Sequence, residues 1–235
     1  MDTDAEGYLT ADGRKIGGVL MEMRNITLRF GGVVAIKDIS FDIREGEIRA
    51  IIGPNGAGKS SMLNVINGFY HPQEGEVWFR GQKRGSVRPY DVARMGIART
   101  FQNIALFKGM STLDNIMTGR LTMTKTGLLS QALWWGKAEA EETYHREKAE
   151  KIIDFLEIQH IRKTPVGRLP YGLQKRVELG RALAAEPKLL LMGVVMDLSD
   201  RVVVMDYGRK IGDGTPDEVR ANPEVINAYL GVAHD

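Results

Sequence analysis

The sequence has 235 residues, enough to bury one substantial core as one large domain or as a domain with a subdomain. Its composition, with 43% hydrophobic and 26% charged residues, is ordinary for a globular protein. The net charge of +2 offers no electrostatic case for nucleic-acid binding, the absence of cysteine excludes disulfide bonds, and the longest uncharged apolar run, 189–196, is too short to cross a bilayer.

The first part of the chain predicts an extension followed by short strands. Residues 1–18 are polar and lack periodicity, so we expect a loose extension, and its acidic start is unlike a signal peptide. We therefore expect any membrane connection to run through a partner. Apolar alternation and intervening turn residues predict short strands, which we expect to form a small antiparallel sheet, at 19–30, 33–36, 39–43 and 77–79.

Residues 48–68 predict a buried strand, a glycine-rich loop and a helix. Ile48–Ile52 is typical of a buried parallel strand, apolar residues from Met62 onward form one side of a helix, and Gly68 marks its end. The loop between them fits the pattern G-x-x-x-x-G-K-[ST]. The residues that we predict to bind nucleotide here are Gly53, Pro54, Asn55, Gly56, Ala57, Gly58, Lys59, Ser60 and Ser61.

This loop suits the binding of a nucleoside triphosphate. Its glycines allow a tight turn that brings successive N–H groups onto a phosphate, and the helix N-terminus adds a favourable dipole. Lys59 can bridge the β- and γ-phosphates, and the Ser60 hydroxyl can ligate Mg²⁺. Upstream, Phe30 ends a predicted strand, where its ring can either stack on adenine or pack in the core, and the sequence leaves both roles open.

The remainder of the chain predicts alternating helices and strands. A capping pattern begins one helix, a second is long and amphipathic with a solvated charged face, and Pro187 closes a third; these helices are expected near 111–119, 137–158 and 171–186. Apolar runs predict strands at 189–192 and 201–206, with a turn at 207–210. Two short helices, each with a capping residue before a proline, are expected to begin near 215 and 222.

Three features together resemble the ATPase subunits of ABC transporters: the phosphate loop, the pair Phe101-Gln102, and the sequence 169–174 before a basic helix. Within that family, the insertion that carries Trp134-Trp135 and the ending 222–231 are similar to the branched-chain amino acid and amide importers. The resemblance covers about residues 19–235. It implies an α/β P-loop NTPase core with an antiparallel β-subdomain and an inserted α-helical subdomain over about 104–186.

The resemblance also implies residue roles. Phe30 matches the adenine-stacking aromatic, and Gln102 matches the glutamine that touches Mg²⁺ and the attacking water. Lys59 and Gln102 are thus the implied catalytic residues, and Ser60 and Gln102 the implied Mg²⁺ ligands. The signature, which in the family binds the ATP held by the opposite subunit, is matched by Leu169, Pro170, Tyr171, Gly172, Leu173 and Gln174.

The cofactors implied by the resemblance are ATP and Mg²⁺. The implied partners are a second ATPase subunit in a head-to-tail homo- or heterodimer, and membrane-spanning permease subunits that hold the protein at the inner face of the cell membrane. No nucleic-acid partner is expected.

The signature departs from the family's commonest pattern. Pro170 stands where a serine usually donates its hydroxyl to the phosphate, and Leu173 replaces a glutamine. Pro170 also lacks a backbone N–H, although Gly172 and the helix N-terminus can still approach an anion. We expect weaker contact with the phosphate rather than loss of function.

A larger departure follows Met192. Family members continue here with Asp-Glu, which anchors Mg²⁺ and activates water, but this chain has Gly193 and Val194, and Asp197 followed by Leu198 is a weak replacement. The family's phosphate-sensing histidine is also missing, because none of the chain's histidines follows an apolar strand; these are His71, His145, His160 and His234.

The spacing of two predicted strands indicates the same departure. Only residues 193–200 separate the strand at 189–192 from the strand at 201–206, whereas a crossover between parallel neighbours needs about a dozen or more. The strands must therefore pair antiparallel, or a segment of on the order of forty residues is missing. The resemblance favours a missing segment, which is either disordered and left out of the numbering, deleted, or naturally absent.

Two functions of different kinds follow. The first is the energy-coupling ATPase subunit of an importer, with hydrolysis impaired in the chain as written because no base is positioned to activate water. The second is a non-hydrolytic module that dimerises in response to nucleotide. A P-loop kinase is disfavoured by the signature and Gln102.

Overall fold

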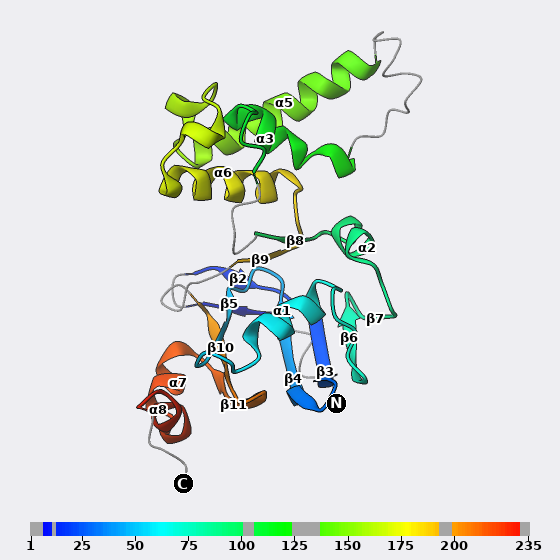
Figure 1. The fold of residues 1–235 in the computed structure, drawn as a ribbon, viewed down its shortest axis with the longest axis vertical. Helices are drawn as coiled ribbons and strands as arrows, with labels where there is room; N and C mark the ends of the chain where they lie inside the picture. Colours follow the sequence, from blue (N-terminus) through cyan, green and yellow to red (C-terminus); the bar gives the residue numbers. More distant parts are fainter. Residues whose placement is uncertain (1–6, 11–12, 101–105, 124–136, 193–198, 231–235) are drawn as a thin grey trace. The chain divides into compact units, whose positions relative to one another are not determined.

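The computed structural model describes residues 7–10, 13–100, 106–123, 137–192 and 199–230. The chain divides into two compact units, one comprising residues 1–89 and 194–235 and the other residues 90–193 (Figure 1). The second unit covers a longer range of residues than the helical subdomain expected over about 104–186.

The first unit contains an antiparallel sheet with the strand order β4-β3-β6-β7. Its strands are β3 (Val19–Phe30), β4 (Val33–Arg44), β6 (Glu74–Phe79) and β7 (Gln82–Arg84). Met23 of β3 lies opposite Phe41 of β4 on one side and Val77 of β6 on the other, and all three side chains are buried. Alternation of apolar residues thus gives the sheet one buried face, as the sequence predicts.

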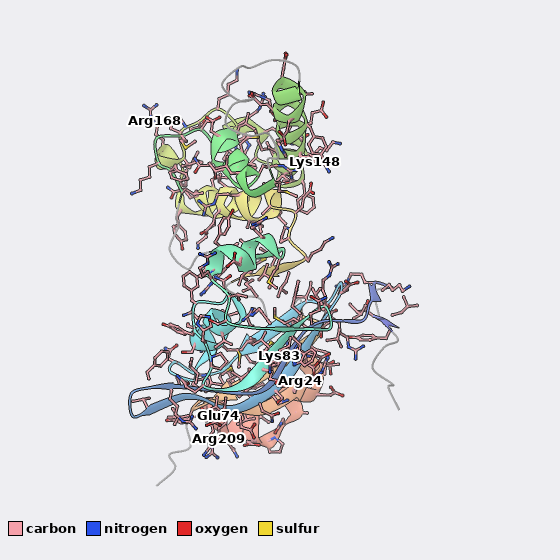
Figure 2. All side chains as sticks on the ribbon, turned by 90° about the vertical axis from the view of Figure 1, so that its right-hand side faces the viewer. Arg24, Glu74, Lys83, Lys148, Arg168 and Arg209 are labelled. Carbon is pink, nitrogen blue, oxygen red and sulfur yellow. The ribbon has the colours of Figure 1, made fainter. Side chains whose placement is uncertain are left out.

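The other face of this sheet carries charged side chains. Arg24 lies 4.4 Å from the centre of the Trp78 ring and donates to Glu22, while Lys83 pairs with Glu76 (Figure 2). These residues alternate with the buried ones, so they form the solvated face of the sheet.

The two strands predicted at 33–36 and 39–43 form one strand, so this expectation is wrong. Asp38, which separates them in the sequence, has a φ of 50° and faces an irregularity in β3 at Asn25, whose φ is 51°. The Asn25 side chain donates to the Asp38 carboxylate over 2.9 Å. Asn and Asp tolerate this left-handed conformation, so the strand continues through a distortion that resembles a turn in the sequence.

A second sheet in the first unit has the order β11-β10-β5. Its strands are β5 (Arg49–Ile52), β10 (Arg201–Asp206) and β11 (Arg209–Gly214). β10 runs parallel to β5, with Val203 opposite Ile51, and antiparallel to β11. The turn predicted at 207–210 is shorter than expected, because Arg209 and Lys210 already belong to β11.

The described residues of this unit form three helices: α1 (Lys59–Ile66), α7 (Pro216–Ala221) and α8 (Pro223–Leu230). α7 and α8 place Val219 and Val225 against Val202 and Val204 of β10 in one buried cluster. The predicted cap of α7 is present, because Thr215 and Glu218 form a reciprocal capping box and Pro216 follows it.

The described part of residues 1–18 is a hairpin rather than a loose extension. Strands β1 (Tyr8–Leu9) and β2 (Lys15–Ile16) pair antiparallel, and the Ile16 side chain is fully buried. The Arg14 guanidinium lies 2.6 Å from the Asp200 carboxylate, which also accepts the backbone N–H of Ile48. Because the partners are far apart in the sequence, local periodicity does not predict these contacts.

The second unit consists mainly of helices around an apolar cluster. In the part of this unit that the structure describes, the helices are α2 (Pro89–Arg94), α3 (Thr112–Thr118), α5 (Lys137–Phe155) and α6 (Tyr171–Ala184), with short 3-10 turns at Leu121–Met123, Gln159–Ile161 and Val166–Arg168. Ile116 of α3, Ile153 of α5 and Val177 of α6 are fully buried in this cluster. The Ser111 side chain accepts the N–H of Asp114, which confirms the predicted cap of α3.

The described residues of this unit also include two short strands. β8 (Ile97–Arg99) and β9 (Leu189–Leu191) pair in parallel, with Ala98 opposite Leu190. β9 thus pairs with β8, whereas β10 pairs with β5 and β11. The antiparallel pairing of the strands at 189–192 and 201–206, one of the two alternatives left by their spacing, is therefore wrong. The Met192–Gly193 junction lies outside the described residues.

Candidate functional site

The predicted phosphate loop lies between β5 and α1 of the first unit (Figure 1). Gly58 is the N-cap of α1 with a φ of 96°, and within the described residues no side chain caps this end. The first turn of α1 also contains no acidic residue. The first N–H groups of the helix therefore have no competing side-chain acceptor, as an anion-binding helix start requires.

Lys59, the first residue of α1, points back over the loop. Its ammonium group donates to the carbonyl oxygens of Gly53 at 2.8 Å and Pro54 at 2.6 Å. The positive charge is thus held at the mouth of the helix by two neutral acceptors. A phosphate oxygen is an anionic acceptor and attracts the ammonium group more strongly than a neutral carbonyl does, so a phosphate can displace these carbonyls.

The loop is held in place by close contact with neighbouring strands. A Cβ atom on Gly53 would lie 1.9 Å from the Met205 carbonyl oxygen of β10, so only glycine fits there. The Ala57 carbonyl accepts the N–H of Gly208 over 3.2 Å, and the Gly208 carbonyl accepts the N–H of Lys37 over 2.7 Å. The β10–β11 turn therefore joins the loop to β4, a contact that the sequence does not predict.

The C-terminal end of α1 also has specific partners. The half-buried Arg84 guanidinium donates to the carbonyls of Val65 and Ile66, and burial lowers the pKa of Arg84 to about 10. The guanidinium group remains charged at neutral pH, and its positive charge interacts favourably with the negative end of the α1 dipole. The sequence around Arg84 contains no motif that predicts a contact with residues 65–66.

One further contact reaches the loop from α8. Burial raises the pKa of the Tyr229 hydroxyl, and a hydrogen bond from the Gly53 backbone opposes this effect. The C-terminal helix therefore contacts the first residue of the loop.

Phe30 lies at the end of β3 and is 45% exposed, so it is not a buried core residue. Its ring contacts Tyr70 edge to face, with ring centres 5.0 Å apart and planes at 74°. An exposed aromatic side chain at the end of a strand offers area for stacking. No sequence motif predicts this role for Tyr70, and its position shortly after Gly68, where α1 has ended, is the one local indication.

The signature residues lie in the second unit, at the start of α6. Pro170 is the N-cap, Leu169 is buried, and Tyr171 and Gly172 are exposed. A Cβ atom on Gly172 would meet no heavy atom within 4 Å. The Gln174 amide donates to the Leu169 carbonyl over 2.7 Å, so this side chain supports the turn before the helix. Leu173 packs against the apolar cluster of this unit.

Several predicted site residues are outside the described part of the chain. Gln102, the implied catalytic and Mg²⁺-binding glutamine, is one of them, as are Trp134-Trp135, residues 193–198 and His234. Within the described ranges no group of three or more His, Cys, Asp or Glu side chains is arranged to hold a metal ion. No described helix is long and apolar enough to span a membrane.

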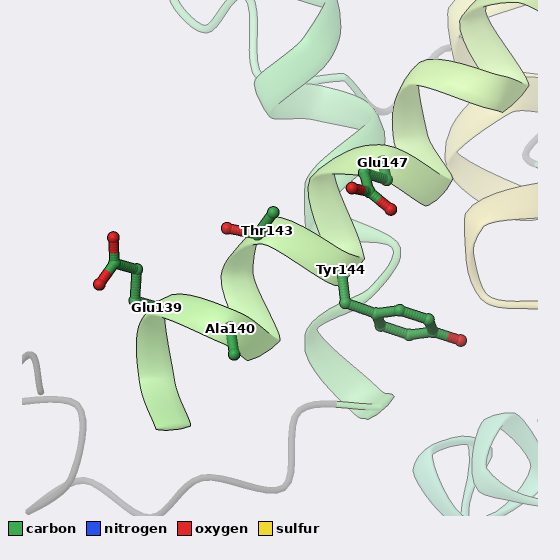
Figure 3. Close-up of a pocket in the computed structure, with 5 residues that line it drawn as sticks. All are labelled: Glu139, Ala140, Thr143, Tyr144 and Glu147. Atoms are coloured by element: carbon green, nitrogen blue, oxygen red, sulfur yellow. The ribbon is translucent and has the colours of Figure 1, made fainter. Parts of the chain in front are cut away.

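A shallow hollow lies along one face of α5 in the second unit (Figure 3). It is lined by Glu139, Ala140, Thr143, Tyr144 and Glu147. All of these residues come from one helix, and within the described residues no second element supplies converging polar groups. The hollow therefore lacks the features of a ligand site.

Two family models match the chain. The model "ABC transporter" matches residues 36–192, and the model "Branched-chain amino acid ATP-binding cassette transporter" matches residues 209–235.

Similar proteins and structures agree with these matches. The chain is 32% identical to the high-affinity branched-chain amino acid transport ATP-binding protein LivG of Salmonella typhimurium and 30% identical to BraF of Pseudomonas aeruginosa, covering 91% of this chain and 98% of each relative. Its structure is similar to that of a nucleotide-free ATP-binding cassette from an ABC transporter, with a TM-score of 0.74 and 30% identity over 91% of this chain and 99% of the other.

The ADP conformation of an ATP-binding cassette gives a TM-score of 0.75 at 29% identity, again over 91% of this chain and 99% of the other. The predicted α/β fold of an ABC ATPase is thereby confirmed. From its phosphate loop, its fold and these matches together, the chain belongs to the ABC transporter family of ATPases, in the group with branched-chain amino acid ATP-binding proteins.

Proposed function

We propose that this chain is the ATP-binding, energy-coupling subunit of an importer for branched-chain amino acids or related amides. The observation that carries the proposal is the start of α1, where uncapped N–H groups and the Lys59 ammonium converge at the mouth of a helix. The relatives are branched-chain amino acid transport proteins, which supports the proposed solute class.

In this proposal the triphosphate lies on the N-terminus of α1. Lys59 exchanges its bonds with the Gly53 and Pro54 carbonyls for bonds to phosphate oxygens. The adenine ring stacks on the exposed face of Phe30, at the end of β3.

A magnesium ion is compatible with the residues present, although they supply few protein ligands. Ser60 follows Lys59 in the first turn of α1, is exposed, and carries a hydroxyl oxygen that suits Mg²⁺. Mg²⁺ commonly takes one or two protein oxygens and completes its shell with phosphates and water. When bound, the ion neutralises charge on the β- and γ-phosphates. Gln102 is proposed as a second ligand on the resemblance alone.

Hydrolysis is expected to be impaired in the chain as written. Gly193 and Val194 occupy the places where the family has its Mg²⁺-anchoring aspartate and water-activating glutamate. Two findings are compatible with a missing segment. The first family match ends at residue 192, and the alignment with LivG spans 255 positions, more than the 235 residues of this chain, although its length does not locate the difference.

The proposed partners are permease subunits in the membrane and a second ATPase subunit. In this arrangement the α6 start, with Pro170 and Gly172, faces the ATP held by the opposite subunit. Pro170 supplies neither a hydroxyl nor an N–H, so we expect a weaker hold on that phosphate than a serine would give.

Calorimetry with MgATP tests the binding site. The 235-residue chain should bind MgATP, and Lys59→Ala should lose at least about tenfold in affinity, since a charge-assisted hydrogen bond contributes roughly 1.5–3 kcal/mol. An unchanged affinity in Lys59→Ala, with the variant folded by circular dichroism, would refute the assignment of the loop.

Phosphate release and light scattering separate the importer ATPase from the alternative, a non-hydrolytic module that dimerises on nucleotide. The chain as written should release phosphate very slowly. Insertion after Met192 of a segment of on the order of forty residues that begins with the family's Asp-Glu pair should restore turnover if the chain is an importer ATPase. An ATP-dependent dimer that never hydrolyses, even with this segment, would favour the alternative. Rapid turnover by the chain as written would contradict the proposed defect.

The solute class requires the partners. In vesicles that contain the permease subunits and the restored ATPase, we expect ATP-dependent uptake of labelled leucine. Uptake of a short aliphatic amide in its place would move the assignment to the amide importers.

A further inference from the structure

The chain that follows α1 is anchored to the helix and to β3 at the same time. Gly68, with a φ of 75°, ends the helical path, and the N–H groups of Phe69 and Tyr70 both donate to the Asn64 carbonyl, at 2.9 and 3.1 Å. Tyr70 is therefore fixed at the C-terminal end of the helix whose N-terminus carries the phosphate loop.

Gln73 attaches the same segment to β3. Its backbone N–H donates to the Thr27 carbonyl at 3.0 Å. Its side chain accepts the N–H of Arg29 at 2.8 Å and donates to the Arg29 carbonyl at 3.1 Å, so it occupies both backbone groups of the residue before Phe30. The main chain on each side of the Phe30–Tyr70 contact is thus held by hydrogen bonds.

The two rings meet edge to face, with centres 5.0 Å apart and planes at 74°. In either sense of this arrangement, Tyr70 leaves at least one face of the Phe30 ring uncovered. Phe30 is 45% exposed, which agrees with a free face. Aromatic pairs of this geometry shift an equilibrium by roughly two- to tenfold.

We propose, on the basis of the nucleotide role proposed above, that Tyr70 is a positioning residue that fixes the Phe30 ring for stacking with the purine base. A side chain at the end of an exposed hairpin would otherwise sample several rotamers, and base binding would have to order it. Through Tyr70, α1 therefore contributes to both ends of the nucleotide: its first turn binds phosphate and its last residues orient the ring that binds the base.

The experiment compares two ligands, MgATP and magnesium tripolyphosphate, which has the phosphates but no base. Calorimetry on the full chain should show that Tyr70→Ala weakens MgATP binding by roughly two- to tenfold. The affinity for tripolyphosphate should not change. Tyr70→Phe keeps the ring and should restore the affinity for MgATP. Phe69→Ala is the matched control, because Phe69 is the neighbouring aromatic, is 52% exposed, and makes no ring contact with Phe30 in the described structure.

A double-mutant cycle isolates the action through Phe30. In a Phe30→Ala background, Tyr70→Ala should have no further effect on MgATP binding. Equal losses for both ligands, a persistent loss in the Phe30→Ala background, or an equal loss in Phe69→Ala would each overturn the proposal.

The failures of the two proposals are distinguishable. If Phe30→Ala selectively weakens MgATP but Tyr70→Ala does not, the positioning role fails and base stacking stands. If Phe30→Ala changes neither ligand, base stacking itself fails, and the positioning role fails with it. Lys59→Ala should weaken both ligands in every case, which separates the phosphate site from the base site.

Discussion

Replacing Gly58 by alanine is expected to destabilise the protein far more than the same replacement at Gly56. Both glycines have left-handed backbones, with φ of 96° at Gly58 and 85° at Gly56. An added Cβ at Gly58 would lie 2.6 Å from the Ala35 carbonyl oxygen and 3.2 Å from the Met205 side chain, whereas at Gly56 it would meet no heavy atom within 4 Å.

These surroundings set the size of the effect. The left-handed conformation costs an alanine about 1–2 kcal/mol at either site. At Gly58 the Cβ also overlaps a backbone oxygen of β4, and such overpacking costs about 1–3 kcal/mol more. Gly58→Ala should therefore lower the free energy of unfolding by about 2–5 kcal/mol, and Gly56→Ala by about 1–2 kcal/mol.

Urea unfolding followed by tryptophan fluorescence measures both values, provided that the slope of the transition stays the same in each variant. MgATP titration of the folded fraction gives a second readout, because a shift at the N-cap of α1 displaces the N–H groups that we propose to bind phosphate. Equal losses of stability in the two variants would refute the close approach of the loop to β4 on which this reasoning depends.

Three further predictions concern stability, and urea unfolding measures each of them. Arg84→Met should cost about 1.5–3 kcal/mol, because the Val65 and Ile66 carbonyls lose a charged donor, and a loss within error would contradict that contact. Thr215→Ala should cost about 0.5–2 kcal/mol by removing the capping box of α7; Asp217→Ala, outside the box, is the control and should cost less. For Asp42, burial raises the pKa, but Arg201, 3.0 Å away, together with Arg49 and Arg44 outweighs this effect and holds the pKa below its ordinary value. The stability that Asp42 contributes is present above its unfolded pKa and is lost as pH falls through the folded pKa. The difference in unfolding free energy between the wild type and Asp42→Asn should therefore shrink below about pH 4. A difference that does not change with pH would argue against the ion pair.

Local patterns in the sequence located the elements around the phosphate loop correctly. The order of apolar strand, glycine-rich loop and helix is written in consecutive residues, and the caps at Ser111 and Thr215 lie three residues from the groups that they bind. The local pattern gave a wrong prediction at Asp38, because an aspartate of this kind can lie in a turn or in a distorted strand. Asp38 resembles a turn but lies within β4, because Asn25 on the partner strand accommodates the distortion.

The sequence by itself determined that a glycine-rich loop joins a strand to a helix that contains Met62, because that motif depends on residues within about a dozen positions of one another. Only the tertiary structure decided that β10 lies beside β5, that Arg84 reaches the far end of α1, and that Tyr70 contacts Phe30. Each of these pairs is separated by at least 18 residues, and the choice among such partners depends on the packing of the whole unit, which no local period encodes.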